Sequence, residues 1–191
     1  KSADGRPMLL EGPEFETISL LGSNCGVSDW PSLVEATLVC DEHGFDTMNA
    51  GGCVSLAMEC FEKGIITLGD TGGIDLRFGN GAALVAALRL MAERRGIGDI
   101  LAEGIKYASE RFGAPELGMH SKGQAMAAYD PRGCKGMALT YATSPKGAHH
   151  MIATTMGPEI AGGTRLSYEN KGALQKENQL TMCAVDSLGI C

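Results

Sequence analysis

One six-residue pattern occurs twice in this chain and constrains its fold more than any other feature. Residues 41–46 (DEHGFD) and residues 186–191 (DSLGIC) both read D-x-x-G, then an apolar residue, then Asp or Cys, about 145 residues apart. The duplication predicts two loops that bind the same kind of chemical group. A carboxylate accepts hydrogen bonds from a donor-rich edge, such as the pyrimidine edge of a pterin. A cofactor that carries two pterins would use this loop twice.

Charge and hydropathy exclude several classes of protein. The chain has 191 residues, a net charge of −7 and a pI of about 5.1. This negative charge argues against a nucleic-acid partner and against an anionic membrane surface. No apolar run reaches the roughly 18–20 residues that a membrane span needs, and no segment resembles a signal peptide. We therefore expect a cytoplasmic protein with one domain or two small ones.

The seven cysteines restrict the chemistry further. In an acidic chain without a targeting segment, they argue against a secreted disulfide scaffold. Because no C-x-x-C pair occurs among them, this chain by itself does not encode a complete zinc or iron–sulfur site. We expect most of the cysteines to pack in an apolar core.

Apolar periodicity, together with glycine and proline positions, predicts a mainly α-helical fold with little sheet. The expected helices cover residues 30–43, 46–63 (capped by Asp46), 80–95, 98–112 and 167–185. A short extended or turn segment is expected at residues 65–77, and an irregular, glycine-rich stretch at residues 125–166. The amino-acid composition changes at residues 113–124, which contain glycine and proline and then Lys122 and Gly123. We therefore expect two helical domains, residues 1–118 and residues 119–191.

Residues 12–17 (GPEFET) carry side chains suited to proton transfer. Glu14 and Glu16 flank Phe15, and on a helix they would lie roughly 200° apart, so that one of them points inward. An inward glutamate beside an aromatic side chain is suited to act as a general base. The alternative is that both glutamates only favour the helix dipole.

Two further segments contain candidate polar groups. Residues 144–150 (SPKGAHH) place His149 and His150 after a glycine turn. Adjacent histidines usually diverge, so we expect one of them to face a site; the alternative is a loop histidine satisfied by backbone groups. In the turn of residues 129–133 (YDPRG), Arg132 is available for a carboxylate or phosphate, or for a structural salt bridge.

Taken together, these segments resemble the aldehyde:ferredoxin oxidoreductase family of tungsten or molybdenum bis-pterin enzymes. The matching segments stand in family order and span nearly all of residues 11–191: GPEFET, LLGSNCG, CDEHGFDTMNAGG, KG, AYDPRG, YATSPKGAHH and CAVDSLGIC. In the family, a sheet domain and a C-x-x-C-x-x-x-C segment precede this stretch. Because neither occurs here, we expect this chain to be a truncated piece with two helical domains of that fold.

The resemblance implies roles for the residues of both D-x-x-G loops. Asp41 and Asp186 would each bind a pterin ring, within loops that also contain Gly44, Asp46 and Gly189. These five residues are therefore the expected cofactor-binding set.

The resemblance also implies three residues for the chemistry. Cys191 would be the fourth thiolate of a [4Fe–4S] cluster. Glu16 and His150 would lie next to the metal and handle protons and the substrate oxygen. The sequence departs from its relatives at Phe15, where tyrosine is frequent. Glu35 matches a residue that binds an iron at a dimer interface in some relatives, but the histidine that partners it there has no counterpart in residues 80–95.

The expected function is oxidation of a small aldehyde to a carboxylic acid, with electrons passing through a [4Fe–4S] cluster to ferredoxin. An aryl carboxylate or aryl-CoA reductase of the same family is the first alternative. A non-catalytic helical interaction module is the alternative from another class. This piece alone is expected to be inactive, and to aggregate or to pair with a second copy as a homodimer.

Overall fold

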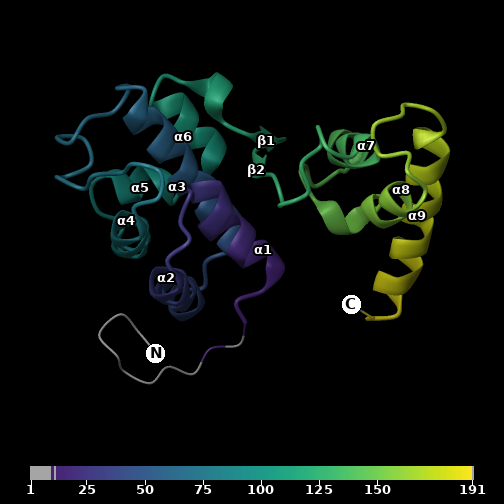
Figure 1. The fold of residues 1–191 in the computed structure, drawn as a ribbon, viewed down its shortest axis with the longest axis horizontal. Coiled ribbons are helices and arrows are strands. Elements are labelled where there is room, and N and C mark those ends of the chain that lie inside the picture. The colour runs from purple at the N-terminus through teal and green to yellow at the C-terminus, as the bar shows by residue number, and fades with distance from the viewer. Residues whose placement is uncertain (1–9, 11, 191) are drawn as a thin grey trace. The chain divides into compact units, whose positions relative to one another are not determined.

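A computed structural model describes residue 10 and residues 12–190, and it is mainly α-helical, as expected. The chain divides into two compact units, the first ending at Met119 and the second beginning at His120 (Figure 1). Among the described residues, no helix is long and apolar enough to cross a membrane.

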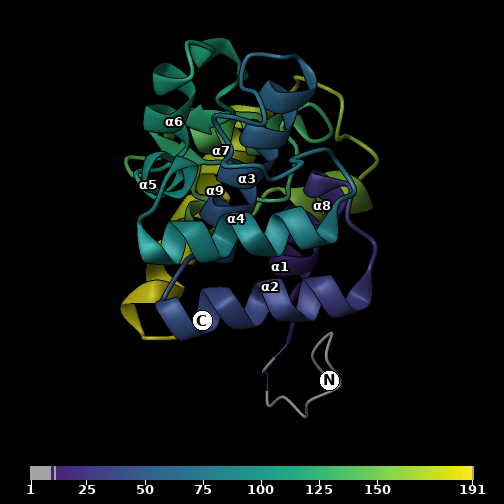
Figure 2. The same ribbon diagram turned by 90° about the vertical axis from the view of Figure 1, so that its left-hand side faces the viewer.

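The first unit contains six α-helices in the described part of the chain. They are α1 (Phe15–Thr17), α2 (Trp30–His43), α3 (Thr47–Glu62), α4 (Gly81–Glu93), α5 (Ile97–Leu101) and α6 (Ile105–Arg111). One π-helical turn (Ile18–Gly22) and one 3-10 turn (Ser23–Cys25) continue α1, and a 3-10 turn (Pro115–Leu117) follows α6. Figure 2 shows α2 and α4 side by side, and the two helices pack together.

The core of the first unit forms around α3, which packs against the five other α-helices described in this unit and against both turns after α1. Buried residues cover most of this helix, a pattern typical of a helix surrounded by protein. They are Ala50, Gly51, Gly52, Cys53, Val54, Leu56, Ala57, Met58 and Cys60. The cysteine prediction is confirmed for five of the chain's cysteines, which are buried: Cys25, Cys40, Cys53, Cys60 and Cys134.

Gly51 allows α3 to approach the turn that follows α1. A Cβ atom at this position would lie 2.6 Å from the backbone carbon and oxygen of Leu20, which is too close for non-bonded atoms. We expect Gly51→Ala to lower the free energy of unfolding by about 1–3 kcal/mol, because backbone must move to accept the methyl group. Urea denaturation followed by circular dichroism measures this loss. Gly172→Ala is the control, since Gly172 lies in a helix with open space around it. An equal loss in both variants would contradict the packing explanation.

Capping residues explain where the helices of the first unit begin. The carboxylate of Asp29 accepts a hydrogen bond from Ser32 N–H at 2.9 Å, and Pro31 occupies the first turn of α2. Asp46 caps α3 as predicted, since its Oδ1 accepts from Met48 N–H at 3.1 Å.

The prediction of a single helix at residues 98–112 is wrong. Gly104 has a φ of +94°, which an α-helix cannot contain, and it separates α5 from α6.

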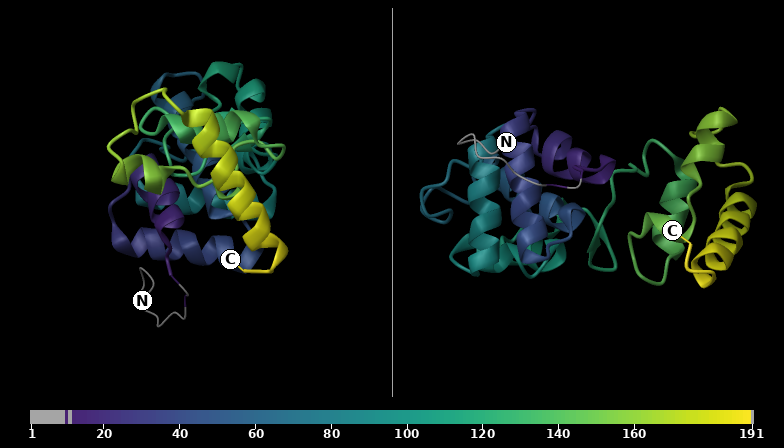
Figure 3. Two further views of the ribbon diagram at one scale, coloured as in Figure 1. Left: turned by 90° about the vertical axis from the view of Figure 1, so that its right-hand side faces the viewer. Right: turned by 90° about the horizontal axis from the view of Figure 1, so that it is seen from below.

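The second unit contains a two-stranded hairpin and three α-helices among its described residues. Strands β1 (His120–Ser121) and β2 (Gln124–Ala125) pair antiparallel, and α7 (Lys135–Thr143), a 3-10 turn (His150–Ile152), α8 (Met156–Ala161) and α9 (Lys171–Ser187) follow. In Figure 3, α9 is the long helix near the C-terminus, and it packs against α7. The prediction of an irregular stretch at residues 125–166 is wrong, because α7 and α8 lie within it. The last helix begins and ends later than the predicted residues 167–185.

Candidate functional site

The first D-x-x-G motif forms the end of α2. Gly44 has a left-handed φ of +70°, and its N–H donates to the carbonyl oxygen of Asp41 at 3.4 Å. The next residue, Phe45, donates its N–H to the carbonyl oxygen of Cys40 at 2.8 Å. These two hydrogen bonds define a Schellman motif, in which glycine satisfies carbonyl groups that the helix leaves open. The side chain of Asp41 takes no part in this turn and is exposed.

The second D-x-x-G motif gives α9 the same end. Gly189 has a φ of +68°, and its N–H donates to the carbonyl oxygen of Asp186 at 3.0 Å. Ile190 N–H donates to the carbonyl oxygen of Val185 at 3.3 Å. Asp186 is exposed, as Asp41 is. The repeated sequence is therefore also a repeated backbone structure, although Cys191, the proposed cluster ligand, lies outside the described residues.

Both aspartates occupy an electrostatically unfavourable position. The C-terminal turn of a helix carries partial negative charge, so a carboxylate there is destabilising by roughly 0.3–1 kcal/mol. Asp41 and Asp186 both lie in such a turn. Neither carboxylate contributes to its turn, so the helix end itself does not explain the choice of aspartate. Each carboxylate is exposed and can accept a hydrogen bond from a ligand.

The carboxylate of Asp41 faces a hollow of about 450 Å³ in the first unit. Its walls come from the segment before and within α1, from α2 and from the loop into α3. The lining residues are Pro13, Glu14, Thr17, Thr37, Asp41, Phe45, Asp46 and Thr47. Three of them are carboxylates, which when ionised only accept hydrogen bonds. The hollow therefore suits a ligand rich in N–H donors and does not suit an anion.

Other interactions hold the walls of this hollow in place. The hydroxyl oxygens of Thr17 and Thr47 lie 2.9 Å apart and join α1 to α3. Asp46 accepts from backbone N–H groups of α3, so its carboxylate both caps that helix and lines the hollow. The structure thus brings together Asp41, Gly44 and Asp46 of the predicted set.

Glu16 lies in α1, between Glu14 and Thr17, which line this hollow, although Glu16 itself is not a lining residue. It is half-buried, whereas the two residues before it, Glu14 and Phe15, are exposed. The expectation that one of the two glutamates points inward is therefore confirmed, and Glu16 is that residue. Phe15 is 59% exposed, so its ring does not cover Glu16 as part of a core.

The predicted histidines lie in the second unit and do not diverge. The rings of His149 and His150 are nearly parallel, with centroids 6.2 Å apart. The ring of Tyr129 lies 5.1 Å from that of His150. Nδ1 of His149 is buried and has no hydrogen-bond partner in the described part of the chain. The expected divergence is therefore wrong, because the two rings stack on each other instead of facing different surroundings.

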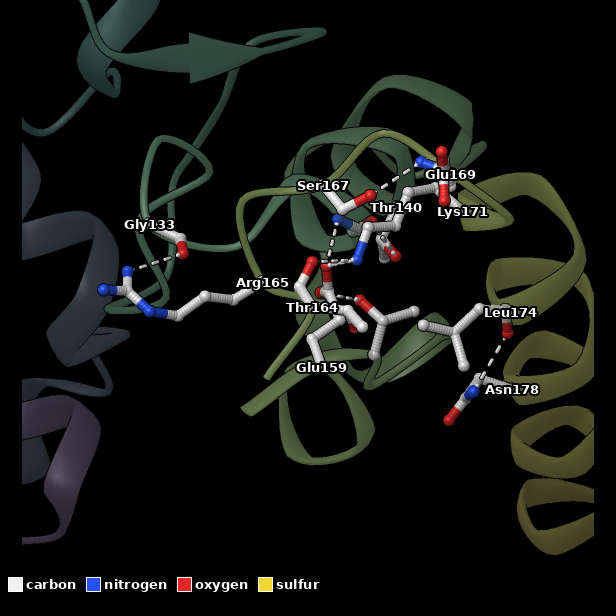
Figure 4. A network of polar contacts seen from close by, with 12 residues as sticks. Gly133, Thr140, Glu159, Thr164, Arg165, Ser167, Glu169, Lys171, Leu174 and Asn178 are labelled. Atoms are coloured by element: carbon white, nitrogen blue, oxygen red, sulfur yellow. Dashed lines mark hydrogen bonds and ion pairs between the residues drawn. The ribbon is translucent and has the colours of Figure 1, made fainter. Parts of the chain in front are cut away.

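A buried ion pair that the sequence analysis did not identify connects the elements of the second unit (Figure 4). Glu159 of α8 is fully buried and Lys171, the first residue of α9, is 7% exposed. Their charged groups lie 2.6 Å apart. Glu159 also accepts from Gly136 N–H of α7 at 2.8 Å and from the Thr155 hydroxyl at 3.0 Å.

This pair fixes the helices that carry the predicted residues. The carboxylate of Glu159 accepts from Gly136 N–H in the first turn of α7, and the ammonium group of Lys171 also donates to the carbonyl oxygen of Thr164 at 2.9 Å. The far end of α7 leads to His149 and His150, and the far end of α9 carries Asp186. In the sequence, Glu159 follows Gly157 and Pro158 and belongs to no motif, so its role could not be predicted.

Two candidate groups are used in ion pairs. Arg132 binds Asp130, with its Nη2 2.7 Å from Oδ2, and these hydrogen bonds lower the pKa of the Asp130 carboxyl group. The structural reading of Arg132 is therefore the correct one. Glu35 forms an ion pair with Arg89 of α4, so a guanidinium group occupies the carboxylate for which a metal was considered.

The described residues contain no group of three or more histidine, cysteine or acidic side chains that could hold a metal ion. The buried cysteines are poor ligands as they stand, because burial raises the pKa of Cys25, Cys40 and Cys53 to about 12. These thiols remain protonated at neutral pH, whereas a metal binds the thiolate.

Comparison with known proteins agrees with the sequence motifs. The family model described as "Aldehyde ferredoxin oxidoreductase, domains 2 & 3" matches residues 1–191. The tungsten-containing aldehyde ferredoxin oxidoreductase of Pyrococcus abyssi is 44% identical over 155 residues, which cover 80% of this chain and 26% of that protein. The protein of the same name from Pyrococcus horikoshii is 43% identical over 155 residues, with the same coverage.

A more distant relative is the "Aliphatic sulfonate oxidoreductase, WOR-like subunit" of Pyrococcus furiosus. It is 30% identical over 148 residues, covering 73% of this chain and 24% of that protein. The chain thus spans about a quarter of the length of the relatives it matches. On the family match over its full length and on these identities, the chain belongs to the aldehyde ferredoxin oxidoreductase family.

Proposed function

We propose that this chain serves a tungsten-pterin oxidoreductase that converts aldehydes to carboxylic acids and passes the electrons through a [4Fe–4S] cluster to ferredoxin. The observation that carries the proposal is the pair of matching helix ends, each presenting a carboxylate that the helix itself does not need. The proposal draws further support from relatives whose names contain tungsten, aldehyde and ferredoxin.

The residues present fit a bis-pterin cofactor in their chemistry. The hollow beside Asp41 is lined by carboxylate acceptors, and a pterin offers N–H donors along one edge. Asp41, with Gly44 and Asp46, would hold one pterin. Asp186 and Gly189 would hold the other, and Cys191 would bind the cluster. Molybdenum in place of tungsten would use the same protein groups.

Oxidation of an aldehyde adds the oxygen of one water molecule and releases two protons and two electrons. A bound metal–pterin cofactor would supply the two-electron acceptor, and a [4Fe–4S] cluster would supply the one-electron relay. Glu16 takes a proton from the water molecule as general base. His150 donates a hydrogen bond to the substrate oxygen as negative charge develops on it. Phe15 offers an apolar side chain and no hydroxyl group.

The alternatives differ in what they predict. An aryl carboxylate or aryl-CoA reductase would use the same cofactor groups in the reverse direction. The higher identity to the aldehyde enzymes than to the sulfonate enzyme, 44% against 30%, favours an aldehyde over a sulfonate as substrate. A non-catalytic helical module would bind neither metal nor pterin. Ferredoxin as acceptor and a homodimer as assembly are part of the proposal.

The test is metal and pterin content in the protein that carries this sequence, purified without oxygen from the cells that make it. We expect about one tungsten or molybdenum and about four irons per chain. Asp41→Asn and Asp186→Asn should each lower metal and pterin content, because the amide group presents a donor where the pterin also presents one. The two losses should be similar in size, since the two helix ends are alike.

Glu42→Gln is the matched control, because Glu42 is exposed and follows Asp41 directly without lining the hollow. It should leave the metal content unchanged. Iron without tungsten or molybdenum in the unmodified protein would indicate an electron-transfer protein. Absence of all three metals would contradict the enzyme and favour the interaction module.

A further inference from the structure

The turn between β1 and β2 contains a backbone conformation that lysine rarely adopts. The strand register pairs Ser121 with Gln124, so Lys122 and Gly123 form a two-residue turn. Their φ values are +54° and +91°. Turns of this kind favour Asn-Gly, because both central residues need a positive φ. Lysine in the first position is strained, which calls for a contribution from its side chain.

The side chain of Lys122 reaches the end of α7. Its ammonium group donates to the carbonyl oxygen of Ser144 at 2.5 Å and lies 3.4 Å from that of Ala142. The last carbonyl groups of a helix lack partners within the helix and carry partial negative charge. A cation placed there makes charge-assisted hydrogen bonds, which are stronger than neutral ones. Lys122 thus satisfies the helix end at which residues 144–150 begin.

The same hairpin also contacts α7 and the middle of this segment. The hydroxyl group of Ser121 donates to the carbonyl oxygen of Tyr141 at 3.0 Å. Gly147 packs directly on Ser121, where a Cβ atom would overlap the carbonyl oxygen, and its φ of +97° also requires glycine. The segment is therefore held at its start by Lys122 and in its middle by Ser121. His149 and His150 follow within three residues of Gly147.

We propose that Lys122 is a positioning residue, which fixes the segment of residues 144–150 and thereby sets the position of His149 and His150. Lys122 fixes the segment through its hydrogen bonds to the end of α7, and the strained turn directs its ammonium group toward that end. The consequence for catalysis rests on the proposed function, in which His150 binds the substrate oxygen. The structural part of the proposal does not rest on it.

Three variants separate the ammonium group from the turn. Lys122→Asn removes the ammonium group but places a residue that tolerates a positive φ better than lysine does. Lys122→Arg keeps the charge and the donors. Lys146→Asn removes the same charge from an exposed lysine of the same segment. Hydrogen–deuterium exchange of residues 145–152 in the full chain is measured first, with circular dichroism as the check on folding.

We expect exchange in this segment to be about ten- to a hundredfold faster in Lys122→Asn, because charge-assisted hydrogen bonds are lost while the turn is relieved of strain. Lys122→Arg should restore most of the protection, and Lys146→Asn should leave it unchanged. Unchanged exchange in Lys122→Asn, or an equal increase in Lys146→Asn, would overturn the proposal.

Steady-state kinetics of the holoenzyme tests the catalytic consequence. In Lys122→Asn, kcat for aldehyde oxidation should fall about tenfold or more with little change in KM, since misplacing a group that acts in the transition state lowers kcat. An unchanged kcat together with faster exchange would overturn the link to His150. A protein that oxidises no aldehyde but shows the exchange pattern would refute the proposed function and leave the positioning role standing.

Discussion

Glu159→Ala is expected to lower the stability of the second unit by about 3–5 kcal/mol, because it leaves the buried ammonium group of Lys171 without its counterion. The loss also removes the acceptor for Gly136 N–H and for the Thr155 hydroxyl group. Urea denaturation followed through the amide signals of α7 and α9 measures it.

The double variant Glu159→Gln with Lys171→Met distinguishes the unpaired charge from other causes. It removes both charges and keeps an acceptor oxygen for Gly136, so most of the stability should return. Asp130→Ala is the control for an ion pair at the surface, since the Arg132 side chain is 83% exposed, and it should cost less than about 1 kcal/mol. If Glu159→Ala cost no more than Asp130→Ala, the buried pair would not be what holds these helices.

Glu16→Gln is expected to lower kcat by about a hundredfold to ten-thousandfold, which is the usual contribution of a general base. Glutamine has nearly the same shape as glutamate but cannot accept a proton at neutral pH. Glu16 is half-buried, so a change of shape there would disturb packing, and the near-isosteric replacement avoids this. Aldehyde oxidation in the loaded holoenzyme is the measurement, with tungsten or molybdenum content determined in the same sample.

The metal content of the Glu16→Gln variant distinguishes a catalytic role from a role in cofactor binding. A loss of kcat at full metal content supports the role of base, whereas parallel losses of both indicate that Glu16 acts in cofactor binding instead. Glu42→Gln, with the same charge change at an exposed position, should retain the activity of the unmodified enzyme. A kcat within about threefold of that enzyme at full metal content would show that Glu16 is not the base.

Residues near each end of a helix were sufficient to predict some of the helix bounds. The helix expected at residues 30–43 is present with those bounds, because Asp29, Pro31 and Gly44 mark its start and end in the sequence. Asp46 could be predicted as a cap for the same reason. The split at Gly104 was also visible as a glycine, but whether a glycine interrupts a helix depends on the packing of its neighbours.

Long-range contacts explain what was missed. The helix α7 contains Gly136 in its first turn and two β-branched threonines, so its local propensity is weak. It is stabilised by the carboxylate of Glu159, which lies 23 residues further along the chain. No sequence pattern within α7 predicts this contact with Glu159. The candidate residues were accessible to sequence reasoning because they occur in ordered motifs, whereas the ion pair that supports them follows no motif.

The Schellman ends of α2 and α9 have a consequence for how such a protein can evolve. Each turn is closed by two backbone hydrogen bonds and one glycine, and the aspartate is attached to it only through its own Cα atom. A substitution at Asp41 or Asp186 therefore changes the chemical group that the helix end presents without remodelling the end itself. If the proposed function is correct, the side chain at each end can change independently of the other, while the backbone that presents it stays the same.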